Sequence, residues 1–159
     1  MYYKRIIKLS FNDKGVRVKR RGLTTTVKMV SYFREDYLRK FLGELGFVEI
    51  PSLITDALKK YGYTYDYKLH GWKITLSGDA TLDERDVDDQ KAANRVATTR
   101  AKYHSYKHAE RFMNYVVTSL EKIVAMFGDS RISLEKFVED EGVALNRVIE
   151  TGYCNPDKQ

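Results

Sequence analysis

Residues 61–77 read YGYTYDYKLHGWKITLS, with a tyrosine at every second position from Tyr61 to Tyr67. Side chains of a β-strand alternate between its two faces, so this spacing places the four tyrosines on one face. Such a face is either a platform on which nucleic-acid bases stack or the inner wall of a core. A turn at His70 and Gly71 would pair tyrosines with apolar residues of the next strand: Leu69 with Trp72, Tyr67 with Ile74 and Tyr65 with Leu76. Aromatic and aliphatic pairs are typical of a buried face, so we predict a hairpin whose tyrosines belong to the core.

The start of the chain predicts a second hairpin, with a strongly basic character. The alternating residues before and after NDKG (residues 12–15) indicate two strands joined by a four-residue turn, and residues 24–33 indicate a third strand. Residues 1–34 carry ten Lys and Arg side chains but one acid, Asp13. The predicted polar face collects Lys4, Lys8, Arg17, Lys19 and Arg21, and Lys14 lies in the turn. This face is either an ordinary solvated surface or, as we favour, a surface that binds a polyanion.

Two short helices are expected between the hairpins, at residues 35–45 and 51–62. A much longer helix follows, since residues 79–127 contain neither glycine nor proline. This segment is one very long helix, or two helices with a break that the sequence does not mark. Its larger residues form a stripe too long for a small sheet to cover, which predicts a homodimer through this helix. The stripe consists of Val96, Tyr103, Met113, Val117, Leu120, Val124 and Phe127.

The same helix carries a second group of basic side chains at helical spacing, namely Arg100, His104, Lys107 and Arg111. We predict that they bind nucleic acid together with the basic hairpin. His104 and His108 have the i, i+4 spacing of a metal-binding pair, but no third ligand is evident and the neighbouring cations would repel a metal ion. The acids of residues 79–89 suit the start of a helix without any metal. We therefore predict no metal site and no cofactor.

Residues 133–153 read SLEKFVEDEGVALNRVIETGY, which indicates two helical segments around Gly142. The pattern resembles a helix-turn-helix motif, but Val138, Glu141 and Thr151 depart from the residue types usual there. Its second segment holds one basic residue, Arg147. We therefore favour an ordinary helical hairpin that covers the sheet.

Residues 78–106 read GDATLDERDVDDQKAANRVATTRAKYHSY. This segment resembles one found in short bacteriophage-encoded proteins, in which acids follow a strand and a helix then opens with small residues and Arg-Ala. The resemblance implies a phage source and no particular activity, since those proteins are mostly of unknown function. Its matching positions are Ala80, Asp83, Asp86, Asp89, Ala93, Ala97, Arg100 and Ala101.

The whole chain of 159 residues, 43% of them hydrophobic, suits a single α+β domain. We expect an antiparallel sheet of two or more hairpins in the N-terminal half and a long helix plus a helical hairpin in the C-terminal half. Residues 1–78 are then mainly β with two short helices, and residues 79–159 are helical. No apolar run reaches the roughly 20 residues that span a bilayer, so we predict no membrane partner.

These features favour a binding protein over an enzyme, because no nucleophile–base pair or phosphate-binding glycine loop is evident. We predict a nucleic-acid-binding accessory protein that contacts DNA or RNA without sequence specificity. The lone cysteine, Cys154, favours a reducing compartment. That compartment is the cytoplasm, of the host cell if the source is a phage. The alternative is a virion or host-takeover (anti-defence) protein that acts by binding other proteins.

Overall fold

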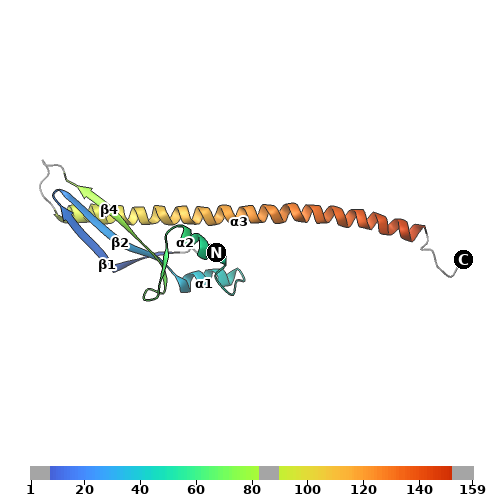
Figure 1. Cartoon of the computed structure of the whole chain (residues 1–159), viewed down its shortest axis with the longest axis horizontal. Helices are drawn as coiled ribbons and strands as arrows, with labels where there is room; N and C mark the ends of the chain where they lie inside the picture. Colours follow the sequence, from blue (N-terminus) through green and yellow to red (C-terminus); the bar gives the residue numbers. More distant parts are fainter. Residues whose placement is uncertain (1–7, 83–89, 152–159) are drawn as a thin grey trace, which may run out of the picture. The chain divides into compact units, whose positions relative to one another are not determined.

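A computed structural model describes residues 8–82 and 90–151 of the chain. The fold class is α+β, as predicted, with a four-stranded antiparallel sheet in the N-terminal half and a long C-terminal helix (Figure 1). Packing divides the chain into two compact units, Met1–Val116 and Val117–Gln159. In order, the elements are β1 (Leu9–Arg21), β2 (Thr24–Arg34), α1 (Glu35–Glu44), α2 (Ser52–Lys60), β3 (Thr64–Asp66), β4 (Gly71–Thr81) and α3 (Gln90–Glu150).

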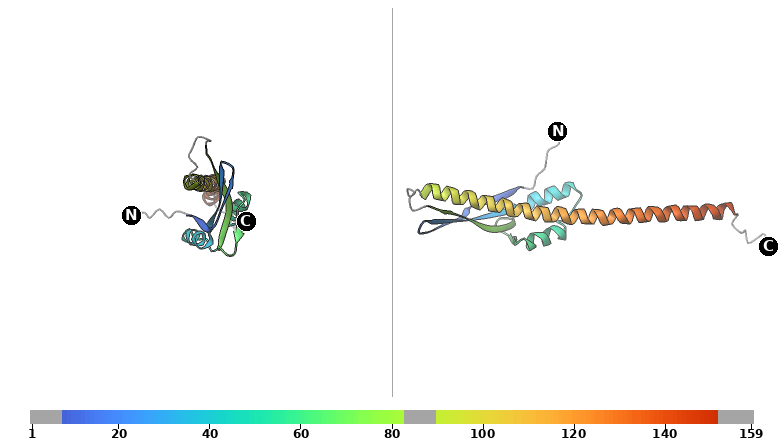
Figure 2. Two further views of the ribbon diagram at one scale, coloured as in Figure 1. Left: turned by 90° about the vertical axis from the view of Figure 1, so that its left-hand side faces the viewer. Right: turned by 90° about the horizontal axis from the view of Figure 1, so that it is seen from above.

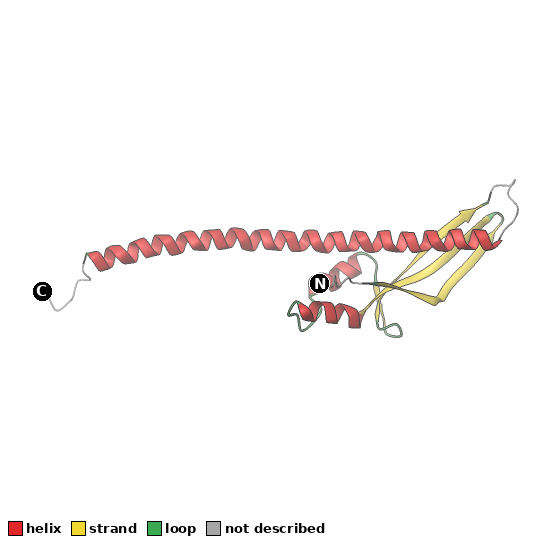
Figure 3. Ribbon diagram, turned by 180° about the vertical axis from the view of Figure 1, so that it is seen from behind, coloured by secondary structure: helices red, strands yellow, loops and turns green. Residues whose placement is uncertain are grey.

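The sheet has the strand order β1-β2-β4-β3, so β2 is flanked by the two other long strands. Alternate residues of β2 are buried, and they define the face that packs in the core: Thr25, Val27, Met29, Ser31 and Phe33. The first part of α3 runs alongside the long strands (Figures 2 and 3). Ala93, Ala97 and Ala101 of this helix form one core cluster with Val27 and Met29. The opposite face of β2 carries Thr24, Thr26, Lys28, Val30, Tyr32 and Arg34.

Helices α1 and α2 close a second core cluster at the other end of the sheet. Leu38 of α1 and Leu58 of α2 pack there with Phe33, Tyr63 and Phe112. The centroids of the Phe33 and Phe112 rings are 5.5 Å apart, and those of Phe33 and Tyr63 are 5.3 Å apart. The two predicted short helices are thus confirmed, and both serve the core.

Small residues, rather than the predicted large ones, form the face of α3 that packs on the sheet. Val96 and Tyr103 are exposed, whereas buried small side chains recur every four residues along the same helix. The reason lies in β4, where a Cβ atom on Gly78 would stand 2.3 Å from both Ala97 O and Ala101 N. The backbones of strand and helix approach so closely that only small residues fit between them. The small buried residues are Ala93, Ala97, Ala101, Ser105 and Ala109, and Phe112 and Val116 are buried further along the same helix.

The predicted turn at residues 12–15 is wrong, because β1 continues as one strand from Leu9 to Arg21. Residues 13–16 instead form an irregularity in the register with β2, between Asn12 and Arg17. The chain reverses later, at Gly22 and Leu23, where Gly22 has a φ of 55°. Glycine adopts this left-handed conformation without steric cost, which suits it to a two-residue hairpin loop.

The tyrosine-rich hairpin exists, but with a longer turn and another register. β3 ends at Asp66, and Tyr65 pairs with Trp72 instead of Leu76. The carboxylate of Asp66 accepts hydrogen bonds from the backbone N–H groups of Lys68 (2.8 Å) and Leu69 (3.1 Å), which starts a turn that replaces further pairing. The core interpretation is confirmed for Tyr63, which is 1% exposed. It is wrong for Tyr67, which lies in the turn and is 83% exposed.

The helical hairpin predicted near the C-terminus is not confirmed. Helix α3 continues through Gly128 and Gly142 and ends at Glu150. A glycine ends a helix when it adopts a left-handed conformation, and neither of these two has a positive φ. An interior glycine costs roughly 1 kcal/mol relative to alanine, which the surrounding helix-forming residues tolerate.

Candidate nucleic-acid interface

Four basic side chains gather on the sheet face that points away from the core. Cross-strand partners lie on the same face, and Arg17 pairs with Lys28, Lys19 with Thr26, and Arg21 with Thr24. Because Thr25 and Val27 of β2 are buried, their neighbours Thr24, Thr26 and Lys28 point to the other side. All four cations are exposed. We call Arg17, Lys19, Arg21 and Lys28 the basic face.

The electrostatics of the basic face are unfavourable for the free protein. Arg17 lies directly opposite Lys28, and like charges at such a cross-strand position destabilise the strand pair. Within residues 8–82 and 90–151, no ion pair joins any of the four cations to an acid. An acid does share this side of the sheet, since Asp79 of β4 pairs with Thr26. The repulsion between the cations would fall if an anion bound between them.

The surroundings of the basic face suit phosphate groups. Together with Thr24 and Thr26 the four cations line an open depression of about 750 Å³. Guanidinium and ammonium groups and threonine hydroxyls are the side-chain donors that usually contact phosphate oxygens. Lys28 was missed by the sequence analysis, because its face depends on the register between β1 and β2.

The other cations predicted for the hairpin are not part of the basic face. Lys14 is exposed in the irregular segment of β1. Lys8 is also exposed, and it lines a different hollow, with Tyr106 and Glu110 of α3. Lys4 lies outside the described residues. A role for these three lysines in nucleic-acid binding stays a prediction.

The predicted basic residues of α3 do share one side of the helix, but several of them bind the backbone of the sheet. Arg100 Nη1 donates to Asp79 O at 2.6 Å, and His104 Nδ1 donates to Ser77 O at 2.8 Å. Both carbonyls belong to the part of β4 that β3 leaves unpaired, since β3 pairs only with residues 71–73. These side chains therefore cover an open sheet edge, which proteins otherwise have to protect from pairing with another chain.

The remaining residues of this group are only partly available for binding. Lys107 Nζ lies 3.0 Å from Glu110 Oε2, and this hydrogen bond raises the pKa of Lys107. His108 Nε2 donates to Tyr61 O at 2.7 Å. Arg111 is exposed and lines a hollow with Tyr103. The predicted basic residues of α3 lie beside β4, whereas the basic face lies on β1 and β2. Binding of nucleic acid by Arg100, His104, Lys107 and Arg111 stays a prediction.

No metal centre is evident in the described ranges, where no three His, Cys, Asp or Glu residues come close enough to hold an ion. His104 and His108 each use a ring nitrogen to donate to a backbone carbonyl. The acids at positions 83–89, which the sequence places before the long helix, lie outside the described residues.

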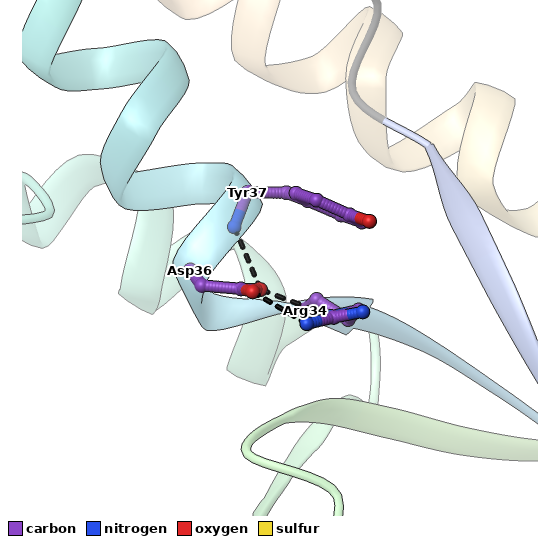
Figure 4. A network of polar contacts seen from close by, with 3 residues as sticks. All are labelled: Arg34, Asp36 and Tyr37. Atoms are coloured by element: carbon purple, nitrogen blue, oxygen red, sulfur yellow. Dashed lines mark hydrogen bonds and ion pairs between the residues drawn. The ribbon is translucent and has the colours of Figure 1, made fainter.

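A second polar cluster lies where β2 passes into α1 (Figure 4). Arg34 Nε donates to Asp36 Oδ1 at 3.0 Å, and the same oxygen accepts the backbone N–H of Tyr37 at 2.9 Å. The guanidinium of Arg34 lies 4.5 Å from the centre of the Tyr37 ring. The hydrogen bonds from Arg34 hold the pKa of Asp36 below its usual range. This arrangement positions the first turn of α1, and it contains no nucleophile next to a base.

Glu35 connects the same cluster to β3. Its carboxylate accepts hydrogen bonds from the Tyr65 hydroxyl and from Arg39 Nε, and these two bonds lower its pKa. The sequence analysis did not identify this network. A usable signal was the i, i+4 spacing of Glu35 and Arg39, although nothing in the sequence indicates the contact with Tyr65.

Comparisons with protein-family models, with curated proteins and with solved structures found no match to this chain. Within the described residues, no helix combines the length and the apolar character needed to cross a bilayer.

Proposed function

We propose that this chain is a nucleic-acid-binding accessory protein that contacts phosphates through the basic face. The observation that carries the proposal is the gathering of Arg17, Lys19, Arg21 and Lys28 on two paired strands, where no acid among residues 8–82 and 90–151 forms an ion pair with them. Cations of this kind supply most of the sequence-independent affinity of proteins for nucleic acids. Phosphate contacts carry no base information, so the expected binding is independent of sequence.

The proposal extends to the setting in which the protein would act. The resemblance of residues 78–106 to phage-encoded proteins supports action on nucleic acid in the cytoplasm of an infected host. No cofactor is needed, because binding by cations requires none.

Protein–protein binding through α3 is the second candidate function, either as a homodimer or within a virion or host-takeover assembly. It is favoured by residues 117–150, none of which is buried although many are large and apolar. Extended apolar surface of this kind usually marks an interface. The two functions are compatible, since a dimer would carry two basic faces.

The test of the first function removes the basic face and leaves the core untouched. Changing Arg17, Lys19, Arg21 and Lys28 together to Gln should weaken binding to both DNA and RNA. The logarithm of the affinity should also depend less on the logarithm of the salt concentration, by about 0.9 for each lost contact on B-DNA. Fluorescence anisotropy with labelled oligonucleotides over a range of salt concentrations measures both quantities.

A control variant removes the same number of charges elsewhere. Lys40, Lys59, Lys68 and Lys91 are exposed and lie outside the basic face. Changing these four to Gln alters the net charge equally, so any general effect of charge appears in both variants. Equal binding by the basic-face variant and the wild-type protein at every salt concentration would show that the basic face does not bind nucleic acid.

A further inference from the structure

Residues 117–150 of α3 form an amphipathic helix whose apolar side is uncovered. At 3.6 residues per turn, most of its apolar side chains align along one side of the helix. Phe127 is 73% exposed, and Leu134 is 63% exposed. A helix of this length gains most of its stability from packing of its apolar side, so the segment needs a partner. The middle of the apolar side is formed by Leu120, Ile123, Phe127, Leu134, Leu145 and Val148.

Two interruptions divide this apolar side, and they indicate what covers it. The helical spacing would continue with apolar residues near positions 130–131 and 141, but Ser130, Arg131 and Glu141 stand there. Ser130 can face an apolar partner, because its hydroxyl already donates to Met126 O at 2.9 Å within the helix. Arg131 Nε lies 3.5 Å from Glu135 Oε1 of the same helix, which leaves the flat side of its guanidinium for a partner. Glu141 needs a neighbour that accommodates a charged group.

A parallel pair of two copies would bring identical residues together. Glu141 would then meet Glu141 of the second copy in the middle of the contact, where water is excluded and like charges repel strongly. Residues 134–150 also carry more acids than bases, and a parallel pair would place the two acidic stretches side by side. An antiparallel pair places this acidic stretch against residues 117–133, in which acids and bases balance.

In an antiparallel pair, one register accommodates both interruptions. Placing Phe127 opposite Glu141 puts the twofold axis at Leu134. The same register places Phe137 opposite Arg131, so each phenylalanine faces an interruption. Arg131 can stack on the phenylalanine ring, and the aliphatic stem of Glu141 can cover the other ring. The aliphatic residues then pair with one another: Leu120 with Val148, Ile123 with Leu145, and Leu134 with Leu134 of the second copy.

We propose that residues 117–150 bind the same residues of a second copy in antiparallel orientation, with the twofold axis at Leu134. This inference rests on the homodimer proposed above and adds its orientation and register. The register also brings like charges near each other at the margins of the contact, Lys122 near Arg147 and Asp129 near Asp140. Salt screens such exposed charges, so the dimer should persist at salt concentrations that abolish nucleic-acid binding.

Disulfide cross-linking of the full chain tests orientation and register together. With Cys154 changed to Ser, the variant carrying Leu120→Cys and Val148→Cys should form a covalent dimer on mild oxidation. Neither cysteine alone should do so. The two positions lie roughly 42 Å apart along one helix, too far for a bond within one chain. Cross-linking of each single variant would instead show a parallel pair and overturn the proposal.

The mass in solution tests the pair itself. Light scattering should give twice the monomer mass of 18.5 kDa for the wild-type protein. Leu134→Glu should yield a monomer that still unfolds cooperatively. Ile132→Glu is the matched control, because Ile132 is 61% exposed but lies on the opposite side of the helix, so this variant should remain a dimer. A wild-type monomer at high micromolar concentration would overturn the proposal.

The same variants separate this inference from the proposed function. Leu134→Glu leaves the basic face intact and should still bind a short oligonucleotide. The basic-face variant leaves residues 117–150 intact and should still be a dimer. If one of the two proposals, nucleic-acid binding or dimer formation, proves wrong, the other is therefore still tested.

Discussion

Among single residues, Gly78 is one whose substitution should clearly lower the stability. A Cβ at this position would stand 2.3 Å from two backbone atoms of α3, Ala97 O and Ala101 N. Backbone atoms cannot rotate away, so Gly78→Ala must push the helix off the strand and open the core around Val27 and Met29. Overpacking of a core usually costs about 1–3 kcal/mol, and we expect a loss at the upper end of this range or beyond it. Urea unfolding measures the change.

Gly43→Ala is the matched control for this prediction. Gly43 lies inside α1, and a Cβ there would meet no atom within 4 Å. Alanine is the better helix former by roughly 0.5–1 kcal/mol, so this variant should be stabilised. If Gly78→Ala proves as stable as Gly43→Ala, the backbones of α3 and β4 do not approach each other closely at Gly78.

Tyr63 gives a second prediction, because its ring and its hydroxyl should contribute in opposite ways. The ring is 1% exposed, whereas the hydroxyl oxygen is buried with no hydrogen-bond partner in the described structure. Burial also raises the pKa of this phenol. Tyr63→Phe should keep or raise the stability by up to about 1 kcal/mol, since it removes an unsatisfied polar group. Tyr63→Ala should lose about 3–5 kcal/mol through the cavity that it leaves.

Thermal or urea unfolding of both variants measures the difference. Tyr67→Ala serves as the comparison, because Tyr67 is 83% exposed and its removal should change the stability by less than about 0.5 kcal/mol. A clear loss of stability in Tyr63→Phe would mean that the hydroxyl has a partner.

The tyrosines also show what a sequence pattern can and cannot predict for single residues. Alternation predicted a buried tyrosine face, and Tyr63 confirms it. The pattern could not show that Asp66 would end the strand, because that depends on backbone N–H groups becoming available in a turn. The spacing of alanines in α3 was a readable signal of the packing face, but large residues on the exposed side obscured it.

For whole elements, the start of α1 depends on the ionisation of Glu35. Hydrogen bonds from Tyr65 and Arg39 lower its pKa from the ordinary value of 4.5. A lowered pKa in the folded state means that the ionised form stabilises the fold. This contribution is complete above the ordinary value and is lost as the pH falls through the lowered pKa. The stability difference between wild type and Glu35→Gln should therefore be largest near neutral pH and shrink in acid.

Urea unfolding of the two proteins from neutral to acidic pH measures this difference. Glu49→Gln is the control, because Glu49 is exposed in the loop before α2, and it should follow the wild type at every pH. A constant difference between wild type and Glu35→Gln across the whole range would exclude the linkage to Glu35.

Elements were easier to predict than their boundaries. Periodicity located both short helices and the strands β2 and β4, because burial of one face imposes a period on the sequence, but it divided β1 into two strands. The predicted boundaries were wrong where a glycine could either make a turn or lie within a strand or helix. Gly15 suggested a turn and lies within β1, while Gly22 makes the turn. Gly142 suggested a break, but α3 supplies no left-handed conformation there.

For the whole molecule, the basic face was predicted only in part. Alternation placed Arg17, Lys19 and Arg21 on one face without any structure. Lys28 requires the register of β2, which depends on where the chain reverses. The bonds of Arg100 and His104 to β4 depend on a sheet edge that β3 leaves open, and no local pattern shows this.

The first unit should fold without the second. All buried side chains in the described part of the chain lie at or before Val116. A fragment that ends at Leu120 keeps the last buried turn of α3 within a hydrogen-bonded helix. It should therefore unfold cooperatively, with a midpoint within a few degrees of the full chain. Loss of cooperative unfolding would show that residues beyond Leu120 complete the core.

The same fragment separates the contribution of one basic face from that of two. It lacks most of the segment proposed to pair, so it should be a monomer. For a duplex short enough to contact one basic face, the fragment and the full chain should bind equally well. For a long duplex, the full chain should bind more tightly, because the second face then binds at a high effective concentration. Equal affinity for the long duplex would mean that the second unit contributes nothing to nucleic-acid binding, whatever its role in assembly.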